Sequence, residues 1–387
     1  MWTLFRTQAI KESMFDSFTF RTAYALSLVL AVLLTSCYTP LTTNPIPQHV
    51  PTSTPAAQVA PVPVSEIDKY LNTLVHIGSF SGSVLIARNG EVLLSKGYGF
   101  ADREQKIINT PQTRFRIGLI TKQFTAMAIV MLEAQAKLDV QDHICSYLPE
   151  CPEAWETITI QHLLTHTSGI PNFTDFTDYR ATNATPSPPE ETTNRFKDKP
   201  LDFQPGEGWG YSNSGYILLG QIIERVSGQS YENFLQEHIF TPLQMTSTGY
   251  DHNQDDLAVG YKGIFGKAEF IDMSIPYAAG ALYSTVEDLY RWDQALYTHQ
   301  LLPQDYLDQI FTAQVTIPNS RGMAYGYGWT IGQENGRQII THAGGIEGFI
   351  SEIARYPQDK TVIIILSNQQ NTSMGIIHSA LAKKVFK

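Results

Sequence analysis

Two apolar runs that flank a turn dipeptide predict a β-hairpin near the start of the folded part of the chain. The segment 83–97 reads SVLIARNGEVLLSKG, and Asn89-Gly90 between its apolar halves is the strongest short signal for a hairpin. A second unit of the same kind lies near the C-terminal end, where Asn335-Gly336 separates two candidate strands within 325–345. Strands are therefore expected at both ends of the folded part.

The sequence between these ends has helical character, with candidate helices at 119–137, 160–165, 214–227, 231–238 and 285–297. The C-terminal sheet continues through 352–355 and 361–368, and a closing helix is expected at 374–385. Strands at both ends with helices between them predict an α+β fold, in which the first and last strands share one antiparallel sheet flanked by helices, with an inserted helical region. Residues 173–200 are rich in Thr, Pro, Asp and Asn and are interpreted as a long loop at the rim of a cleft.

Residues 1–36 have the features of an export signal. Three basic residues precede an uncharged apolar run at 23–34, which is shorter than the roughly 20 residues of a membrane-spanning helix. The run ends Leu-Thr-Ser-Cys37, which resembles the lipobox of bacterial lipoproteins, whose cysteine is diacylated and becomes the new N-terminus. This resemblance implies a protein anchored through Cys37 to the bacterial cell membrane, facing the periplasm or the exterior. The alternatives are ordinary secretion with an incidental cysteine, and a start codon at Met1 or Met14.

Residues 37–64 are interpreted as a spacer between this anchor and a single folded domain at 65–387. Residues 38–64 contain seven prolines and no Asp, Glu, Lys or Arg, so they cannot bury enough apolar surface to fold. Fully extended, this spacer would reach roughly 80 Å at about 3.1 Å per residue.

The charge and cysteine content exclude several classes of function. Lys and Arg number 27 and Asp and Glu 37, so the formal net charge is −10, and removal of 1–36 changes it to 24 − 35 = −11. With no basic surplus, nucleic-acid binding is not expected. Three cysteines cannot form a disulfide framework or a four-cysteine zinc site, and His143, His162 and His166 do not have the spacing of a ligand set. No metal or other cofactor is expected.

Five motifs in order resemble the serine β-lactamase and penicillin-binding-protein superfamily. They are FSGSVLIARNGEVLLSKGYGFAD at 80–102, TRFRIGLITKQFTAMAIVMLE at 113–133, ITIQHLLTHTSGI at 158–170, FQPGEGWGYSNSGYILLGQIIERVSG at 203–228 and ITHAGGIEGF at 340–349. One such motif would be weak evidence, whereas five at compatible spacings are very hard to obtain by chance. The likeness is greatest to the class C-like branch, which includes D-alanyl-D-alanine carboxypeptidases and esterases. It implies a β-lactamase/transpeptidase-like fold and acyl transfer or hydrolysis on D-Ala-type amides, β-lactams or esters.

The chain departs from the family pattern at the nucleophile. That pattern is Phe-Arg-Ile-Gly-Ser-x-x-Lys, and residues 115–122 read FRIGLITK, so the lysine is in register as Lys122 but the serine is Leu119. Leucine has no nucleophilic atom, so the acyl-enzyme chemistry of the family cannot run through this position.

The other site residues of the family are present at matching positions. Residues 119 and 122 are neighbours on a helix, where the family's lysine is the base for the serine hydroxyl. Tyr211, in Tyr-Ser-Asn, would lie near the nucleophile and relay protons. Without the motif context, Lys122 would be interpreted as a solvated helix lysine, and Tyr211 as part of a turn before a helix.

The remaining matches concern the ligand. The resemblance implies that Asn213 donates a hydrogen bond to the acyl-side amide carbonyl and that His342 orients a substrate carboxylate or the Tyr211 hydroxyl. Gly344 would let a ligand approach the strand edge. The main-chain N–H groups of Gly345 and of residue 119 would form the oxyanion hole, and Leu119 still supplies its half. A structural strand histidine is the alternative for His342.

Three interpretations of the function remain open. The chain is a family member with impaired catalysis that binds a small-molecule or peptide ligand, such as a D-amino peptide, a β-lactam or an ester. Alternatively it is an active hydrolase, either through another nucleophile or because position 119 is a sequence error, since some serine and leucine codons differ by one base. Thr121, Ser168 and Ser212 are unconvincing replacements. The third interpretation is a non-catalytic, peptide-binding surface lipoprotein.

Cys145 and Cys151 flank the short segment SYLPE. Because exported proteins meet oxidising conditions, we expect these two residues to be joined by a disulfide bond. The sequence does not show whether their Cα atoms lie within about 7 Å, which such a bond needs.

Overall fold

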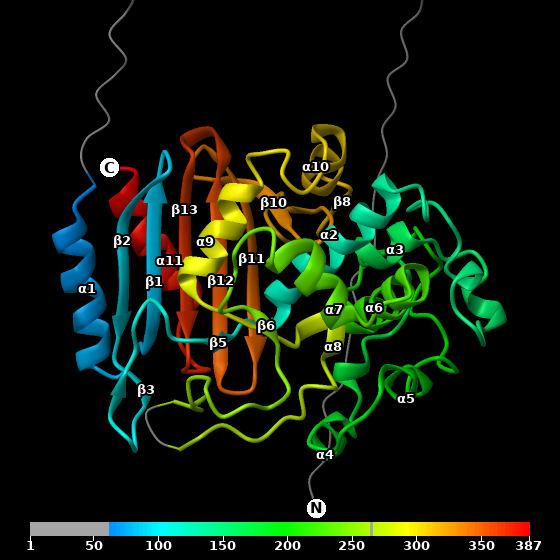
Figure 1. Cartoon of the computed structure of the whole chain (residues 1–387), viewed down its shortest axis with the longest axis horizontal. Coiled ribbons are helices and arrows are strands. Elements are labelled where there is room, and N and C mark those ends of the chain that lie inside the picture. The colour runs from blue at the N-terminus through cyan, green and yellow to red at the C-terminus, as the bar shows by residue number, and fades with distance from the viewer. Residues whose placement is uncertain (1–61, 264–265) are drawn as a thin grey trace, which may run out of the picture. The chain divides into compact units, whose positions relative to one another are not determined.

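An antiparallel sheet of eight strands crosses the computed structural model, which describes residues 62–263 and 266–387 (Figure 1). Its strands are β1 (Gly82–Arg88), β2 (Glu91–Tyr98), β8 (Val315–Thr316), β9 (Ala324–Tyr325), β10 (Thr330–Glu334), β11 (Arg337–Ile346), β12 (Phe349–Tyr356) and β13 (Thr361–Ser367). The order across the sheet is β2-β1-β13-β12-β11-β10-β9-β8. β1 pairs with β13 from Gly82 opposite Ser367 to Arg88 opposite Thr361. The prediction that the two ends of the folded part share one sheet is therefore confirmed.

The two asparagine-glycine dipeptides form the hairpin turns that the sequence predicts. Asn89 and Gly90 have φ values of 55° and 79°, and Asn335 and Gly336 have φ values of 51° and 77°. A two-residue turn with positive φ at both positions matches the right-handed twist of the strands that it joins, and asparagine and glycine tolerate that conformation best.

The remaining strands form two small sheets, one of β3 (Phe100–Asp102) with β4 (Ile107–Ile108) and one in the order β5 (Phe115–Arg116), β7 (Leu282–Ser284), β6 (Gly249–Tyr250). The α-helices are α1 (Val64–His76), α2 (Thr121–Ala134), α3 (Ile160–Leu164), α4 (Tyr179–Thr182), α5 (Pro189–Asn194), α6 (Asn213–Ser227), α7 (Tyr231–Leu235), α8 (Tyr277–Gly280), α9 (Val286–Ala295), α10 (Gln304–Phe311) and α11 (Met374–Val385). Short 3-10 turns are η1 (Gly118–Ile120), η2 (Ile144–Ser146), η3 (Glu153–Trp155), η4 (Phe173–Asp175) and η6 (Pro357–Asp359), and η5 (Gln236–Phe240) is π-helical.

Both faces of the large sheet are covered, as β13 illustrates. Val362, Ile364 and Leu366 belong to a large core that also contains residues of α2, α6 and α9. Ile363 and Ile365 belong to a smaller core with residues of α1 and α11. Successive side chains of a strand point to opposite faces of the sheet, so a strand that is buried on both faces is apolar at every position. This is why β13 has the continuous apolar run that its sequence shows.

The interpretation of residues 173–200 as one long loop is wrong. This segment contains η4, α4 and α5, and Phe173, Asn183 and Phe196 within it are buried. The short helices escape a sequence pattern because each has at most six residues, fewer than two turns, so little periodicity is visible. Aromatic rings hold this segment in place by packing against Trp155 and against one another. The ring centroid of Phe196 lies 6.0 Å from that of Trp155 and 6.2 Å from that of Phe173.

Residues Val59–Lys387 form one compact unit, and both cores consist of residues from it. The predicted signal at 1–36, the lipidation site Cys37 and the spacer up to residue 61 lie outside the described residues. Within 62–263 and 266–387, none of the helices combines the length and the apolar composition that crossing a bilayer requires.

Cys145 and Cys151 form a disulfide in the structure, with Cα atoms 5.3 Å apart. We expect alkylation of the exported protein without reductant, followed by mass spectrometry, to leave both cysteines unlabelled. The same treatment after reduction is the positive control. Two labelled thiols in the unreduced protein would contradict the bond.

Candidate active site

Residue 119 lies in η1, the turn that leads directly into the central helix α2. Every residue of α2 from Thr121 to Leu132 is buried, so the helix is fixed on all sides. Gly118 before it has a φ of 51°, and a Cβ atom there would lie 3.0 Å from the Gly345 carbonyl oxygen. Glycine therefore allows η1 to lie against β11, which brings residue 119 to the end of that strand.

Leu119 lines a cavity of about 340 Å³ between η1, α6, α8 and the β11–β12 end of the sheet. The other lining residues are Phe173, Thr174, Tyr179, Asn213, Pro276, Ala279, Gly280, Gly345, Ile346, Glu347, Phe349, Ile350 and Gln370. Three positions that the sequence assigns to the site, 119, 213 and 345, thus border one cavity. At 119 the group that faces it is an isobutyl side chain.

Lys122 is completely buried one helical turn after Leu119. Its Nζ donates hydrogen bonds to Asn213 Oδ1 at 2.7 Å and to the Ala279 carbonyl oxygen at 2.9 Å. No carboxylate among the described residues pairs with it, and burial holds the pKa of the amine well below its usual range. The neutral amine that this favours keeps a lone pair beyond its two donated bonds, which is what a general base needs.

Tyr211 places its ring next to this amine. Its ring centroid lies 5.0 Å from Lys122 Nζ and 4.3 Å from the His166 ring centroid. The hydroxyl is buried and has no hydrogen-bond partner among the residues that the structure describes, and burial raises the pKa of Tyr211 well above its usual range. A buried hydroxyl without a partner costs roughly 1–3 kcal/mol, so this group is available to a ligand or to a side chain at a neighbouring position.

Asn213 begins α6 and uses its whole side-chain amide within the protein. Besides accepting from Lys122, it donates through Nδ2 to Asn172 Oδ1 and to Thr174 Oγ1, both at 3.2 Å. Its main-chain N–H donates to the same Asn172 oxygen at 3.0 Å. A ligand carbonyl that accepted from Asn213 would take the place of one of these two neighbours.

His342 on β11 has both ring nitrogens engaged. Nδ1 lies 2.7 Å from the carbonyl oxygen of Ala343, and Nε2 lies 2.9 Å from the Tyr325 hydroxyl. Burial is the main cause that lowers the pKa of His342 to about 3. The ring is therefore neutral at ordinary pH, donates from Nδ1 and accepts from Tyr325. Its ring centroid is 6.4 Å from that of Tyr211, and Tyr325 is the phenol to which it is hydrogen-bonded.

Gly344 and Gly345 bring the main chain of β11 against η1. A Cβ atom at Gly344 would lie 2.1 Å from the Ile117 carbonyl oxygen and 3.0 Å from the Leu119 nitrogen, so only glycine fits. A Cβ atom at Gly345 would meet nothing within 4 Å, because that residue borders the cavity. The two main-chain groups proposed for an oxyanion hole thus belong to segments in direct contact.

Four residues of this site were not singled out for it from the sequence. Asn172 and Thr174 hold Asn213, Tyr325 holds His342, and His166 accepts a hydrogen bond from the Ser212 N–H at 3.2 Å beneath the Tyr211 ring. His166 lies in the recognised HTSGI segment, and that motif was the available signal for it. Tyr325 had no such signal, because its contact with His342 depends on the pairing of β9, β10 and β11.

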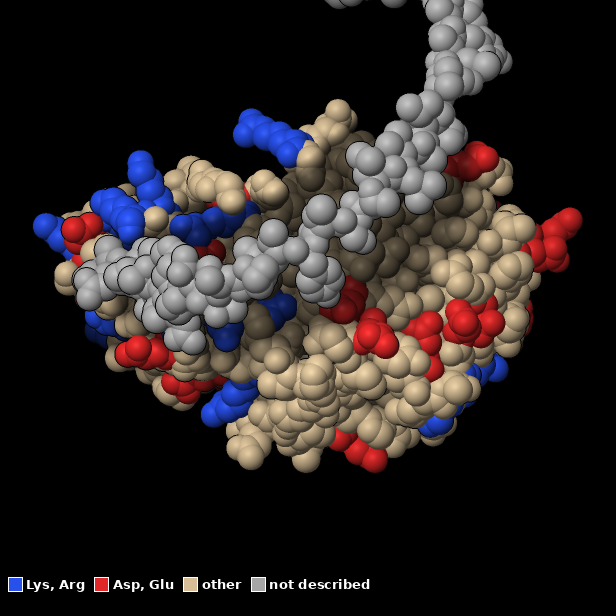
Figure 2. All heavy atoms as spheres, turned by 90° about the horizontal axis from the view of Figure 1, so that it is seen from above, with Lys and Arg blue, Asp and Glu red and all other residues tan. Residues whose placement is uncertain are grey.

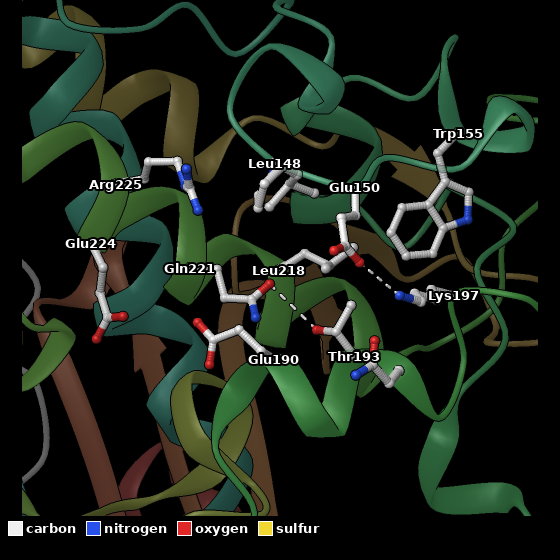
Figure 3. A pocket seen from close by; sticks show the side chains of 12 residues that line it. Leu148, Glu150, Trp155, Glu190, Thr193, Lys197, Leu218, Gln221, Glu224 and Arg225 are labelled. Atoms are coloured by element: carbon white, nitrogen blue, oxygen red, sulfur yellow. Dashed lines mark hydrogen bonds and ion pairs between the residues drawn. The ribbon is translucent and has the colours of Figure 1, made fainter.

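A second hollow, of about 480 Å³, lies away from these residues (Figure 3). Thr193 Oγ1 donates to Gln221 Oε1 at 3.3 Å on one side of it, and Glu150 pairs with Lys197 at 3.0 Å on the other. None of the family-motif residues 119, 122, 211, 213 and 342 lines it. The cavity at Leu119 is therefore the candidate active site.

A family model described as Beta-lactamase matches residues 67–385 of the chain. The chain belongs to the β-lactamase family. PbpX of Bacillus subtilis (strain 168), a candidate penicillin-binding protein, is 34% identical over 325 residues, which cover 82% of this chain and 78% of that protein. The octameric penicillin-binding protein homologue from Pyrococcus abyssi has a TM-score of 0.74 at 29% identity, over 83% of this chain and 77% of that one.

The same fold occurs in the D-amino acid amidase from Ochrobactrum anthropi SV3, solved in complex with D-phenylalanine. Its TM-score is 0.71 at 23% identity, over 83% of this chain and 98% of the amidase. The expected β-lactamase/transpeptidase-like fold is confirmed by these likenesses and by the sheet order. The chain is a β-lactamase-related member of a serine hydrolase family.

Proposed function

We propose that this chain is an exported, lipid-anchored member of the β-lactamase family that binds a small acyl or peptide ligand beside residue 119 without forming an acyl intermediate there. One observation carries the proposal. An isobutyl side chain lines the cavity at the position where the family motif has its nucleophilic serine, while the base, Lys122, stays buried and hydrogen-bonded one turn away.

The state of Tyr211 supports this proposal. Its buried hydroxyl lacks a hydrogen-bond partner among the described residues, next to an amine whose burial favours the neutral form. A hydroxyl at position 119 is the partner that the family motif would bring. A decayed site would be expected to lose costly buried polar groups, because each one left unpaired destabilises the fold. Retention of Lys122, Tyr211, Asn213 and His342 together favours a cleft that still binds.

The cavity lining suggests a ligand with an apolar side chain and an amino group. Phe173, Tyr179 and Phe349 supply aromatic walls, and Glu347 adds a carboxylate. That carboxylate accepts one hydrogen bond, from Asn183 Nδ2 at 3.1 Å, and has further lone pairs for an ammonium group. A D-amino acid amide or D-amino peptide fits this lining best. A β-lactam or an ester would use the same carbonyl contacts.

The wild-type protein is expected to form no stable adduct with a fluorescent penicillin or a fluorophosphonate, because residue 119 offers no nucleophile. Intact-protein mass spectrometry checks this. A D-amino acid amide should nevertheless bind reversibly, measured by calorimetry, and Glu347→Gln should weaken that binding. An adduct on the wild-type chain would mean that another nucleophile exists. No reversible binding would favour a purely structural surface lipoprotein.

The anchoring half of the proposal is motivated by the apolar run followed by Leu-Thr-Ser-Cys37. Detergent phase partitioning of the expressed protein should place the wild-type chain in the detergent phase. Cys37→Ser should become soluble or fail to mature, because no thiol remains to be acylated. Equal partitioning of the two proteins would remove the lipoprotein assignment.

A further inference from the structure

A cationic groove lies at the end of the sheet where three hairpin turns meet the C-terminal end of α11. It has a volume of about 400 Å³. Its lining residues are Arg88, Asn89, Arg337, Gln358, Asp359, Lys360, Val385, Phe386 and Lys387. This is the end of the molecule that faces the viewer in Figure 2, where Lys and Arg side chains gather on the left and Asp and Glu are more frequent on the right.

Two guanidinium groups are held over one aromatic ring in this groove. The Arg337 guanidinium carbon lies 4.5 Å from the Phe386 ring centroid, and that of Arg88 lies 5.4 Å from it. Arg88 is fixed further by donating to Thr361 Oγ1 at 3.3 Å and to the Val385 carbonyl oxygen, and Arg337 donates to Asp359. Burial is the main cause that lowers the pKa of Arg88, and the charge of Arg337 adds to it against the opposing effect of Asp359. Two like charges are thus kept close by packing.

The groove has unbalanced positive charge on a protein that is acidic overall. Four of its nine described lining residues are cationic, and Asp359 is the acidic side chain among them. The side chains of the groove therefore sum to 4 − 1 = +3, whereas the side chains of the whole chain sum to −10. Neither Lys360 nor Lys387 has an ion-pair partner among the described residues. Paired guanidinium groups with adjacent ammonium groups suit the oxygen atoms of a phosphate.

The groove also lies beside the start of the described chain. Lys384, directly before Val385, pairs with Glu66 in the first turn of α1 at 3.2 Å. Val62 and Val64 pack on the same core as Phe386. The first described residues of the chain therefore lie beside the residues that line this groove. A long spacer alone would not fix the orientation of the domain at a membrane, whereas a cationic surface on the domain would.

We propose that this cationic groove docks the domain on the phosphate headgroups of anionic phospholipids, at the membrane to which the spacer leads. Basic side chains near such a surface each contribute to attraction, and the effect fades within a Debye length. The proposal goes beyond the proposed function. Docking of the groove requires neither a ligand in the cleft nor a lipid on Cys37. A negative result for docking is therefore distinguishable from a negative result for lipid anchoring or for ligand binding.

The test uses a chain that starts at Tyr38, which keeps the whole compact unit Val59–Lys387. At low ionic strength, this chain should sediment with phosphatidylglycerol vesicles and much less with phosphatidylcholine vesicles. A triple variant should bind these vesicles about tenfold or more weakly, because each basic side chain near an anionic surface contributes to the attraction. Its substitutions are Arg337→Gln, Lys360→Asn and Lys387→Gln. Asparagine is chosen at 360 because Lys360 has a φ of 43°.

A matched control removes the same number of charges elsewhere, with Lys106→Asn, Lys137→Gln and Lys199→Gln, and should keep most of the binding. Because Arg337→Gln also removes an ion pair, Lys360→Asn with Lys387→Gln alone is measured too and should give a smaller loss. Equal binding to both vesicle types, or equal loss in groove and control variants, would overturn the proposal. So would binding of inorganic phosphate or of a soluble anionic polymer without vesicle binding, since the ligand would then not be a membrane.

Discussion

Leu119→Ser is expected to give covalent labelling by a fluorescent penicillin and an esterase rate orders of magnitude above that of the wild-type chain. The serine would lie one turn before Lys122, whose neutral amine can accept its proton. The Tyr211 hydroxyl, which has no partner among the described residues, would gain one. In triad hydrolases that lack the nucleophile, the oxyanion hole and substrate binding alone keep a rate enhancement of roughly 10³–10⁴-fold over the reaction in water. The gain in rate from Leu119→Ser therefore measures what the nucleophile adds to that background.

Two variants separate the chemistry of this change from its shape. Leu119→Ala removes the isobutyl group without supplying a nucleophile, so it should not label, although it could bind a ligand more tightly. Leu119→Ser combined with Lys122→Ala should lose the gained turnover, because the base is gone. Labelling is read by gel fluorescence and turnover with a chromogenic ester. An unlabelled Leu119→Ser protein that is folded would show that the site has decayed beyond one residue.

Asp293→Ala is expected to cause the largest loss of stability among single changes far from the cleft. Arg355 on β12 and Asp293 on α9 form an ion pair with 2.6 Å between Nε and Oδ1, and their side chains are only 2% and 1% exposed. The guanidinium carbon also lies 4.6 Å from the centroid of the Tyr297 ring and 5.1 Å from that of Phe311. Removing the carboxylate leaves a cation in aromatic surroundings, which costs about 3–5 kcal/mol of unfolding free energy.

Chemical denaturation followed by fluorescence measures this loss. Glu269→Ala is the matched control, because it breaks an ion pair with Lys262 whose side chains are 67% and 49% exposed, and it should leave the midpoint almost unchanged. Asp293→Asn keeps the side-chain volume and one hydrogen-bond acceptor, so its loss of stability should fall between those of Asp293→Ala and Glu269→Ala. If Asp293→Ala were as mild as the control, water would have to reach Arg355.

The parts of the fold that follow from local sequence were predictable. The two Asn-Gly turns, the apolar run of β13 and the helix α11 each depend on a few consecutive residues, and all appear as expected. The segment 173–200 was not predictable, because its short helices depend on distant aromatic partners such as Trp155. The structure also has the π-helical turn η5, which continues α7 to Phe240 where the sequence predicts a helix at 231–238.

The candidate site divides in the same way. By itself, the sequence determined the family to which the motifs belong, the register of Lys122 and the absence of a nucleophile at 119, because a motif is a local string and leucine is chemically inert in any fold. The tertiary structure alone decided that Asn172 and Thr174 accept hydrogen bonds from the Asn213 amide and that Tyr325 rather than Tyr211 is hydrogen-bonded to His342. It also left the Tyr211 hydroxyl without a partner among the described residues. It also placed residues 88, 337 and 360 in one groove. Hydrogen bonds and charge clusters between residues far apart in the chain depend on strand register and helix packing, which no local pattern encodes.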